Sequence, residues 1–178
     1  MVDIRIDPVN AEVALVENLV EKLSSIFTFE VEIRRRLNLS DIISFYDEDR
    51  EQVRADLLLE DLLNRFPTDT YSLILVDADA YVSGLNFVFG VARPGWGALV
   101  FLSRLKQGVY GGTAPQALFE LRVLKETLHE LGHVLGLGHC RTPRCVMSFS
   151  NSLIDVDRKA PAYCVRCLNR LAPYIRLH

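Results

Sequence analysis

The 178-residue sequence has no long hydrophobic run and no excess of positive charge. Its apolar segments, such as Leu73 to Val76, are far shorter than the roughly 20 residues that a membrane-spanning helix needs. The 20 lysines and arginines are outnumbered by 23 acidic residues and form no sustained run, so no electrostatic signature of nucleic-acid binding is present. We therefore expect neither a membrane nor a nucleic-acid partner.

Several other features are missing. The amino-terminal stretch MVDIRIDPVN lacks the hydrophobic region of a secretory signal, so we expect a cytoplasmic protein. In that reducing compartment the four cysteines are more typical of metal binding or reactivity than of disulfides. There is no internal repeat and no obvious pro-segment with a spare cysteine that could block a metal ion. The composition, 49% hydrophobic and 24% charged, predicts one globular domain over residues 1–178.

Apolar periodicity predicts alternating strands and helices over the first part of the chain. Near the amino terminus, Ile4 and Ile6 alternate with Arg5 and Asp7, which predicts a strand with one buried face. The remaining strands are expected over residues 29–37, 71–79, 85–92 and 97–105, and helices over residues 9–25 and 50–66. The predicted fold class is therefore α/β (α+β), and we expect the first 112 residues to serve mainly as a scaffold.

A further helix is predicted from Thr113 onward. Thr113 and Gln116 have capping-box spacing, and Pro115 suits a first turn. A stripe of leucines with helical periodicity follows, at Leu121, Leu124, Leu128, Leu131 and Leu135. His129 and His133 project away from the centre of this stripe. We therefore expect both histidines to face away from the core.

Residues 129–139 form the pattern HExxHxxGxxH. A lone histidine is more often structural, but His129 and His133 are four residues apart, so both rings can reach one ion. Gly136 permits the left-handed turn that brings His139 back to the same ion. Three neutral nitrogen donors leave zinc an open position where bound water ionises near pH ~7. Glu130, which follows the first ligand, is placed to act as general base on that water.

The cysteines follow directly. In an extended segment neighbouring side chains point in opposite directions, so Cys140 should turn away from an ion that His139 binds. The C-x4-C and C-x2-C spacings suit a closed structural zinc site with four thiolate ligands. Two disulfides, or free buried cysteines, are the alternatives. The expected ligands are Cys140, Cys145, Cys164 and Cys167.

The segment HELGHVLGLGHCRTPRCVM, followed by YCVRC, resembles the archaemetzincin family of metzincin-type zinc metallopeptidases. The resemblance is close over residues 129–167 and looser upstream. It implies a metzincin-like zincin domain with a mixed twisted sheet packed with helices. Residues 1–138 would form a sheet-and-helix subdomain ending in the active-site helix, and residues 139–178 a zinc-stabilised subdomain. Two zinc ions per chain are implied, one catalytic and one structural.

The same resemblance assigns further roles. Met147 would be the methionine of the Met-turn beneath the site, and residues 85–92 would be an edge strand to which a peptide substrate adds by main-chain hydrogen bonds. Some members lack the third histidine, which this chain retains as His139. Several members are described as aminopeptidases. Tyr163 is a candidate for stabilising the oxyanion, with a core or zinc-loop role as the favoured alternative.

The expected function is hydrolysis of peptide bonds in peptide or protein substrates by zinc-bound water, with aminopeptidase or short-peptide action as the narrower expectation. One alternative is a non-catalytic peptide- or protein-binding module that keeps both zinc ions. Another alternative is a zinc ribbon that binds nucleic acid. The net negative charge and the scarcity of basic residues interspersed with aromatic ones disfavour it. The sequence predicts neither the substrate sequence nor the oligomeric state.

Overall fold

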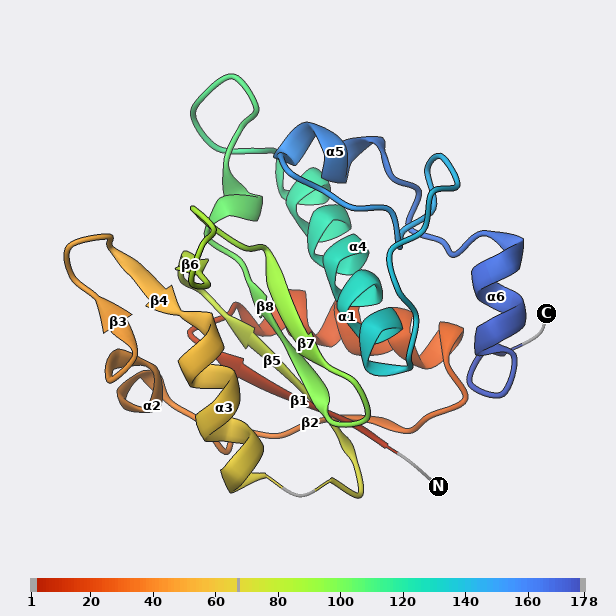
Figure 1. Cartoon of the computed structure of the whole chain (residues 1–178), viewed down its shortest axis with the longest axis horizontal. Coiled ribbons are helices and arrows are strands. Elements are labelled where there is room, and N and C mark those ends of the chain that lie inside the picture. Colours follow the sequence, from red (N-terminus) through yellow and green to blue (C-terminus); the bar gives the residue numbers. More distant parts are fainter. Residues whose placement is uncertain (1–2, 67, 177–178) are drawn as a thin grey trace.

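A five-stranded mixed sheet forms the centre of the computed structural model, which describes residues 3–66 and 68–176. The strand order is β2-β1-β5-β8-β7 (Figure 1). The edge strand β7 runs antiparallel to β8, whereas the other neighbouring pairs are parallel. The strands are β1 (Ile4–Val9), β2 (Val31–Ile33), β5 (Tyr71–Val76), β7 (Gly90–Arg93) and β8 (Gly97–Phe101). This confirms the predicted fold class.

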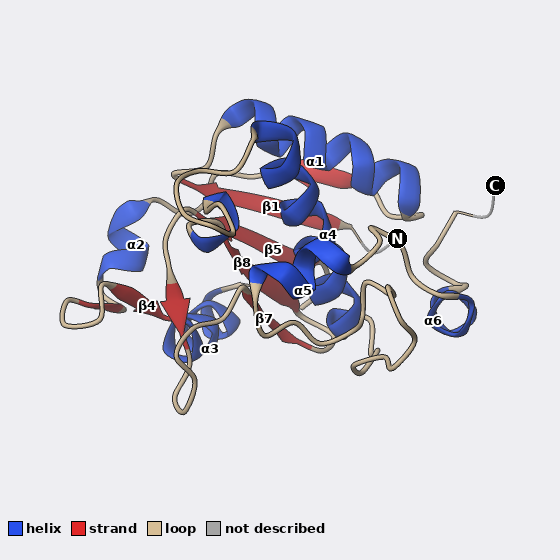
Figure 2. Cartoon of the chain, turned by 90° about the horizontal axis from the view of Figure 1, so that it is seen from above, coloured by secondary structure: helices blue, strands red, loops and turns tan. Residues whose placement is uncertain are grey.

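Helices cover both faces of the sheet. Helices α1 (Val13–Ile26) and α4 (Gln116–Val134) share one hydrophobic core, and α3 (Ala55–Arg65) contributes to a second core on the opposite face (Figures 1 and 2). Strand β5 serves both cores because successive side chains point to opposite faces. Its Leu73 and Leu75 lie in the first core, and Ile74 and Val76 lie in the second.

Smaller elements surround this framework. A three-stranded sheet has the order β3-β4-β6. Its strands are β3 (Tyr46–Asp47), β4 (Gln52–Arg54) and β6 (Ala80–Tyr81). The remaining elements are α2 (Leu39–Ile43), the 3₁₀ turn η1 (Arg104–Lys106), α5 (Leu153–Arg158) and α6 (Val165–Leu171). The sequence patterns did not predict these elements, most of which have six or fewer residues.

The carboxy-terminal segment packs against the earlier part of the chain. Arg122 on α4, which is fully buried, makes two 2.7 Å hydrogen bonds to the carboxylate of Asp157. Lys125 Nζ donates to the carbonyls of Val156 and Asp157 at 3.1 and 3.0 Å. Near the end of the chain, Ile175 forms a β-bridge with Phe27. Buried charges on α4 are therefore satisfied by residues more than 30 positions later.

Several predicted boundaries were wrong. The strand predicted over residues 29–37 is limited to β2, and the helix predicted over residues 50–66 starts later because Gln52–Arg54 pair as β4. Asp7 was predicted on an exposed face, but it is buried and accepts hydrogen bonds from Arg36. The predicted capping box at Thr113 does not form, since α4 begins at Gln116 and Thr113 instead bridges to Gln107.

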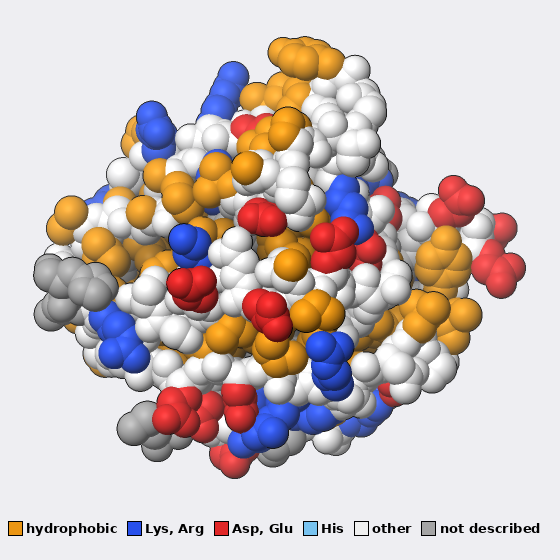
Figure 3. All heavy atoms as spheres, turned by 180° about the vertical axis from the view of Figure 1, so that it is seen from behind, with side chains coloured by type: hydrophobic (Ala, Val, Ile, Leu, Met, Phe, Trp, Pro, Cys, Tyr) orange, Lys and Arg blue, Asp and Glu red, His pale blue; other side chains and the backbone are white. Residues whose placement is uncertain are grey.

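The surface gives two further observations. Figure 3 shows the face opposite to that of Figure 1, where acidic and basic side chains are interspersed with hydrophobic ones. Within residues 3–66 and 68–176, no helix combines the length and hydrophobicity needed to cross a bilayer.

Candidate metal centres and cleft

Helix α4 ends in a turn that depends on Gly136. This glycine has a φ of 89°, in the left-handed region that favours glycine. Its N–H bonds to the carbonyl of His133 at 3.0 Å, and the N–H of Leu137 bonds to the carbonyl of Gly132 at 2.8 Å. These two bonds constitute a Schellman motif, which redirects the chain after the helix. The turn brings His139 beside the two helix histidines, as the sequence pattern predicted.

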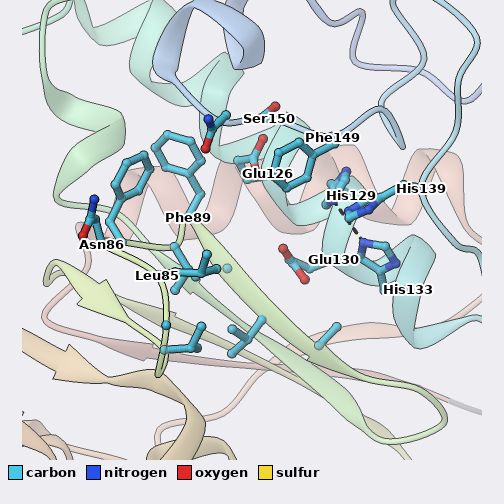
Figure 4. A pocket seen from close by; sticks show the side chains of 18 residues that line it. Leu85, Asn86, Phe89, Glu126, His129, Glu130, His133, His139, Phe149 and Ser150 are labelled. Atoms are coloured by element: carbon cyan, nitrogen blue, oxygen red, sulfur yellow. Dashed lines mark hydrogen bonds between the residues drawn. The ribbon is translucent and has the colours of Figure 1, made fainter.

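The three histidines form a compact cluster. Their ring centroids are 4.6, 5.3 and 4.9 Å apart, and one nitrogen from each lies within 4.8 Å of the others. The Nε2 atoms of His129 and His133 are 3.1 Å apart (Figure 4). Two nitrogen donors bound to one zinc at ~2.0–2.1 Å in tetrahedral geometry would be separated by about 3.4 Å. The cluster therefore has the dimensions and the donor type for one zinc ion.

Backbone carbonyls orient the two helix histidines. Nδ1 of His129 lies 2.8 Å from the carbonyl oxygen of Val146, and Nδ1 of His133 lies 2.8 Å from that of Leu137. A carbonyl only accepts, so each Nδ1 carries the proton and each Nε2 presents its lone pair to the cluster. Such hydrogen bonds to backbone carbonyls are typical of metal-binding histidines.

The expectation that both helix histidines face away from the core was wrong for His129, which is only 6% exposed. The segment containing Val146 and Lys159 covers that side of the helix. Burial, followed by the charge of Lys159, lowers the pKa of His129 to about 3. Burial also lowers the pKa of His139. Both shifts favour the neutral imidazole that binds a metal.

Glu130 lies against the edge strand. A Cβ atom at Gly90 of β7 would come within 2.6 Å of Cγ of Glu130, so the absence of a side chain there makes room for the carboxylate. Glu130 is buried, and its pKa is raised well above the ordinary value by burial and then by the nearby Glu126. A carboxyl group in this setting holds a proton more readily than one in water.

Met147 and Tyr163 both contact the backbone of helix α4. A side chain at Gly132 would clash with Sδ of Met147, which is fully buried, so the methionine packs directly against the helix backbone. Tyr163 is buried, and its hydroxyl donates to the carbonyl of Leu128 at 2.6 Å. That bond directs the Tyr163 hydroxyl to the helix backbone, which agrees with the favoured core role.

The four cysteines form a second cluster. Sγ of Cys140 lies 3.7 Å from that of Cys164, and Sγ of Cys145 lies 3.8 Å from that of Cys167. All four sulfurs lie within 4.8 Å of one another. A tetrahedral zinc site with Zn–S bonds of ~2.3 Å has sulfurs about 3.8 Å apart, whereas a disulfide bond is ~2.0 Å long. These distances match a four-thiolate metal site and disagree with disulfides.

Backbone amides contact two of these sulfurs. The N–H of Thr142 points to Sγ of Cys140 at 3.4 Å, and that of Cys164 points to Sγ of Cys145 at 3.3 Å. Hydrogen bonding from Cys167 lowers the pKa of Cys164 to about 6, whereas burial raises the pKa of Cys145. A bound cation would favour the thiolate form of every cysteine in the cluster.

A cleft of about 510 Å³ opens over the histidine cluster. One wall is residues 84–92, of which only residues 90–92 belong to the edge strand β7. The predicted strand over residues 85–92 was therefore too long, although its position at the sheet edge is confirmed. Residues 149–151 form part of the opposite wall, and the Phe149 ring lies 5.2 Å from that of His139.

Several cleft residues were missed by the sequence analysis, among them Glu126, Phe149 and Ser150. Glu126 lies on α4 three residues before His129, a spacing that places both on neighbouring parts of the helix surface. The three-residue spacing between Glu126 and His129 was the only feature of the sequence that could have placed Glu126 near the histidine cluster. Phe149 and Ser150 reach the cleft through the path of a loop, which no local pattern in the sequence indicates.

Comparisons with known proteins agree with this geometry. The family model described as Peptidase family M54 matches residues 9–173. The archaemetzincin of Pyrococcus furiosus is 43% identical over 156 residues, covering 85% of this chain and 81% of that protein. The archaemetzincin of Saccharolobus islandicus is 38% identical over 161 residues, covering 90% and 87%.

Solved structures are also similar. The crystal structure of archaemetzincin from Methanopyrus kandleri superposes with a TM-score of 0.81 at 36% identity, covering 97% of this chain and 94% of that chain. The archaemetzincin from Archaeoglobus fulgidus, crystallised with malonate, gives a TM-score of 0.78 at 35% identity, covering 94% and 99%.

Proposed function

Because the chain belongs to peptidase family M54, the archaemetzincin family of zinc metallopeptidases, we propose that it hydrolyses peptide bonds at a zinc ion held by His129, His133 and His139. The observation that carries this assignment is the convergence of three imidazoles. Two of these rings are held by carbonyl bonds in the tautomer that presents Nε2. Zinc bound there would supply a Lewis acid for the scissile carbonyl and would lower the pKa of a bound water.

Glu130 is the general base in this proposal. It follows a histidine of the cluster, lines the cleft and is positioned by the space that Gly90 leaves. In the reaction the carboxylate removes a proton from the attacking water and delivers it to the leaving amine. The raised pKa of Glu130 favours the protonated form that donates to the leaving nitrogen in the second step, whereas the first step requires the ionised carboxylate.

Peptides enter along β7 in this proposal. As an edge strand, β7 has one side unpaired with the sheet, and an extended peptide can pair with that side through main-chain hydrogen bonds. The mostly apolar wall over residues 84–92 would accept side chains of the peptide. Aminopeptidase action is the narrower form of the proposal.

A second zinc ion is assigned to Cys140, Cys145, Cys164 and Cys167. The matching sulfur distances support a closed structural site, which leaves no position for a substrate. The cluster joins the turn after Cys140 to the start of α6, so in this proposal the ion stabilises the segment that covers His129.

Digestion of an unbiased peptide library, read by mass spectrometry, tests the assignment of the base. We expect the parent protein to cleave peptides and Glu130→Ala to lose about 10²–10⁴-fold in rate, because general-base catalysis contributes that much. The zinc content of Glu130→Ala should equal that of the parent, since the residue is not a ligand. Retained turnover in this variant would place the base elsewhere, and stoichiometric peptide binding without turnover by the parent would favour a non-catalytic module.

A further inference from the structure

One carboxylate in the cleft has no role in the reaction described above. Glu126 lies on α4 one turn before Glu130, is 3% exposed and lines the cleft. In the view of Figure 4 its carboxylate lies between the side chains of Phe89 and Phe149. The low exposure of Glu126 means that little water reaches its side chain.

The hydrogen-bonding capacity of Glu126 is largely unused. Among the described residues none donates a hydrogen bond to its Oε1, and Lys159 Nζ forms only a long ion pair with that atom at 3.5 Å. The hydroxyl of Ser150, on the opposite wall of the cleft, likewise has no partner among the described residues. A carboxylate has about four acceptor positions, and leaving them unfilled in a buried site costs free energy. Two buried polar groups at this one cleft therefore lack a hydrogen-bond partner among the described residues.

The charge of the cleft indicates which ligand. Among the described lining residues none is lysine or arginine, and the two carboxylates are Glu126 and Glu130. An ammonium group supplies three N–H donors and a positive charge, so it can fill both the acceptor and the electrostatic requirement of Glu126. A carboxylate or phosphate ligand would add repulsion at the same position.

The spacing along the helix favours a terminal amine over a lysine side chain. Residues four apart on a helix have Cβ atoms about 5–6 Å apart, so a group bound by Glu126 lies close to the peptide bond that is attacked by the water that Glu130 deprotonates. Consecutive Cα atoms of a peptide are about 3.8 Å apart. The recognised nitrogen is therefore within about two residues of the scissile bond. An α-ammonium group meets this limit directly, whereas a long flexible lysine side chain must fold back.

We propose that Glu126 binds the free α-ammonium group of the peptide substrate, with the Ser150 hydroxyl as a second contact. Glu126 thereby restricts cleavage to the first one or two residues of a chain. This inference rests on the proposed peptidase function. Glu126 acts as a specificity residue in this scheme, and Lys159 Nζ forms an ion pair with its carboxylate at 3.5 Å.

Paired peptides test the inference. Peptides of identical sequence with a free or an acetylated amino terminus are compared by kcat/KM. We expect the parent to prefer the free peptide and Glu126→Gln to lose about 10- to 100-fold of that preference, because a hydrogen bond to a charged group is worth about 1.5–3 kcal/mol. Glu120→Gln is the matched control, since it removes a carboxylate from the same helix at a position that does not line the cleft.

Two additional measurements distinguish loss of substrate recognition from a general effect of the substitution on the protein. Glu126→Gln leaves Lys159 buried without its partner, so the double variant Glu126→Gln/Lys159→Met, which removes both charges, is measured in parallel. Binding is then measured by calorimetry in the Glu130→Ala background, where the expected slow turnover interferes less with the measurement. Free peptide should bind more tightly than acetylated peptide, and adding Glu126→Gln should abolish the difference.

The outcomes separate the two proposals. Equal cleavage of free and acetylated peptides by the parent, or an unchanged preference in both Glu126 variants, overturns the role of Glu126 and leaves the peptidase function standing. A parent preference for internal lysine, lost in Glu126→Gln, overturns the α-ammonium assignment in favour of a basic side chain. Cleavage of neither peptide, with no binding, overturns the proposed function itself and this inference with it.

Discussion

The histidine and cysteine clusters are neighbours in sequence but are built in different ways. His129 and His133 lie on a 19-residue helix that packs against the central sheet, and only His139 arrives from a following turn. The cysteine cluster instead joins residues 140–145 to residues 164–167, segments that contain mainly turns and the start of a seven-residue helix. Helix α4 holds two ligands of the histidine cluster in place. In the cysteine cluster, the ligands lie mainly in loops, and a bound ion would link the two segments.

This difference indicates what each metal contributes. A helix packed on a sheet keeps its shape without an ion, so zinc at the histidines would complete a site that is already formed. The four cysteines come from two segments without a long helix or strand, and backbone bonds such as that from Val146 N–H to the Ala162 carbonyl at 3.0 Å also join this region, so zinc binding there would be coupled to its folding. The proposed catalytic and structural roles are consistent with the different support that surrounds each ligand set.

The largest expected effect is that of Cys164→Ser. Structural zinc binds with apparent free energies of about 10–16 kcal/mol in zinc-finger peptides, and whole domains have stabilities of about 5–15 kcal/mol. We therefore expect this variant to lose one of two zinc equivalents and the cooperative folding of the segment after Met147. The comparison variant His133→Ala should lose the other zinc and its activity, with a stability change of about 1 kcal/mol. Thermal melts and metal analysis of both variants beside the parent measure these effects.

If Cys164→Ser and His133→Ala melt at the same temperature, the two clusters do not differ in their contribution to stability. The division into catalytic and structural zinc would then be wrong. A parent with one zinc equivalent and oxidised cysteines would instead remove the four-cysteine assignment. His139 offers an internal check, since it precedes Cys140. Disorder of the cysteine cluster should displace His139 and reduce activity, whereas loss of His133 should leave the cysteine cluster intact.

A smaller effect is expected where the helix ends. Gly136→Ala places a side chain in the left-handed region, which costs about 1–2 kcal/mol, although its Cβ would meet no atom within 4 Å. The matched control is Gly138→Ala, which also meets no atom but has no positive φ. Denaturant unfolding should show a loss for the first variant and little change for the second. Equal losses in both would mean that the turn does not depend on the conformation of Gly136.

The local geometry of the candidate site was predictable from sequence because it depends on short-range rules. The spacing of His129 and His133 on a helix, the left-handed turn at Gly136 and the opposite directions of His139 and Cys140 all follow from backbone geometry. The structure brings these residues together as the pattern predicted. The assignment of each residue to a metal remains a prediction.

Contacts between distant segments were not predictable in the same way. Helical periodicity identified one apolar stripe on α4, but residues 125–132 are buried all round because the segment after Cys140 packs on the second side. The burial of His129 and Glu130 and the pairing of Arg122 with Asp157 follow from that packing. Residues 85–89 belong to the strand predicted over residues 85–92, yet in the structure they lie outside β7 and line the cleft.

The buried cationic side chains Arg122 and Lys125 of α4 affect how the protein can fold during its synthesis. Arg122 also donates to the carbonyls of Leu105 and Gln107, but its ion pair with Asp157 and the hydrogen bonds of Lys125 need residues 156–157, so α4 cannot reach its final environment until that later segment has left the ribosome. At about 5–20 residues per second, the intervening 30 or so residues take on the order of seconds. During this interval we expect the nascent helix to be a target for chaperones and proteases. Proteolysis of arrested nascent chains of increasing length should show protection of α4 only after Asp157 has emerged; earlier protection would contradict this order.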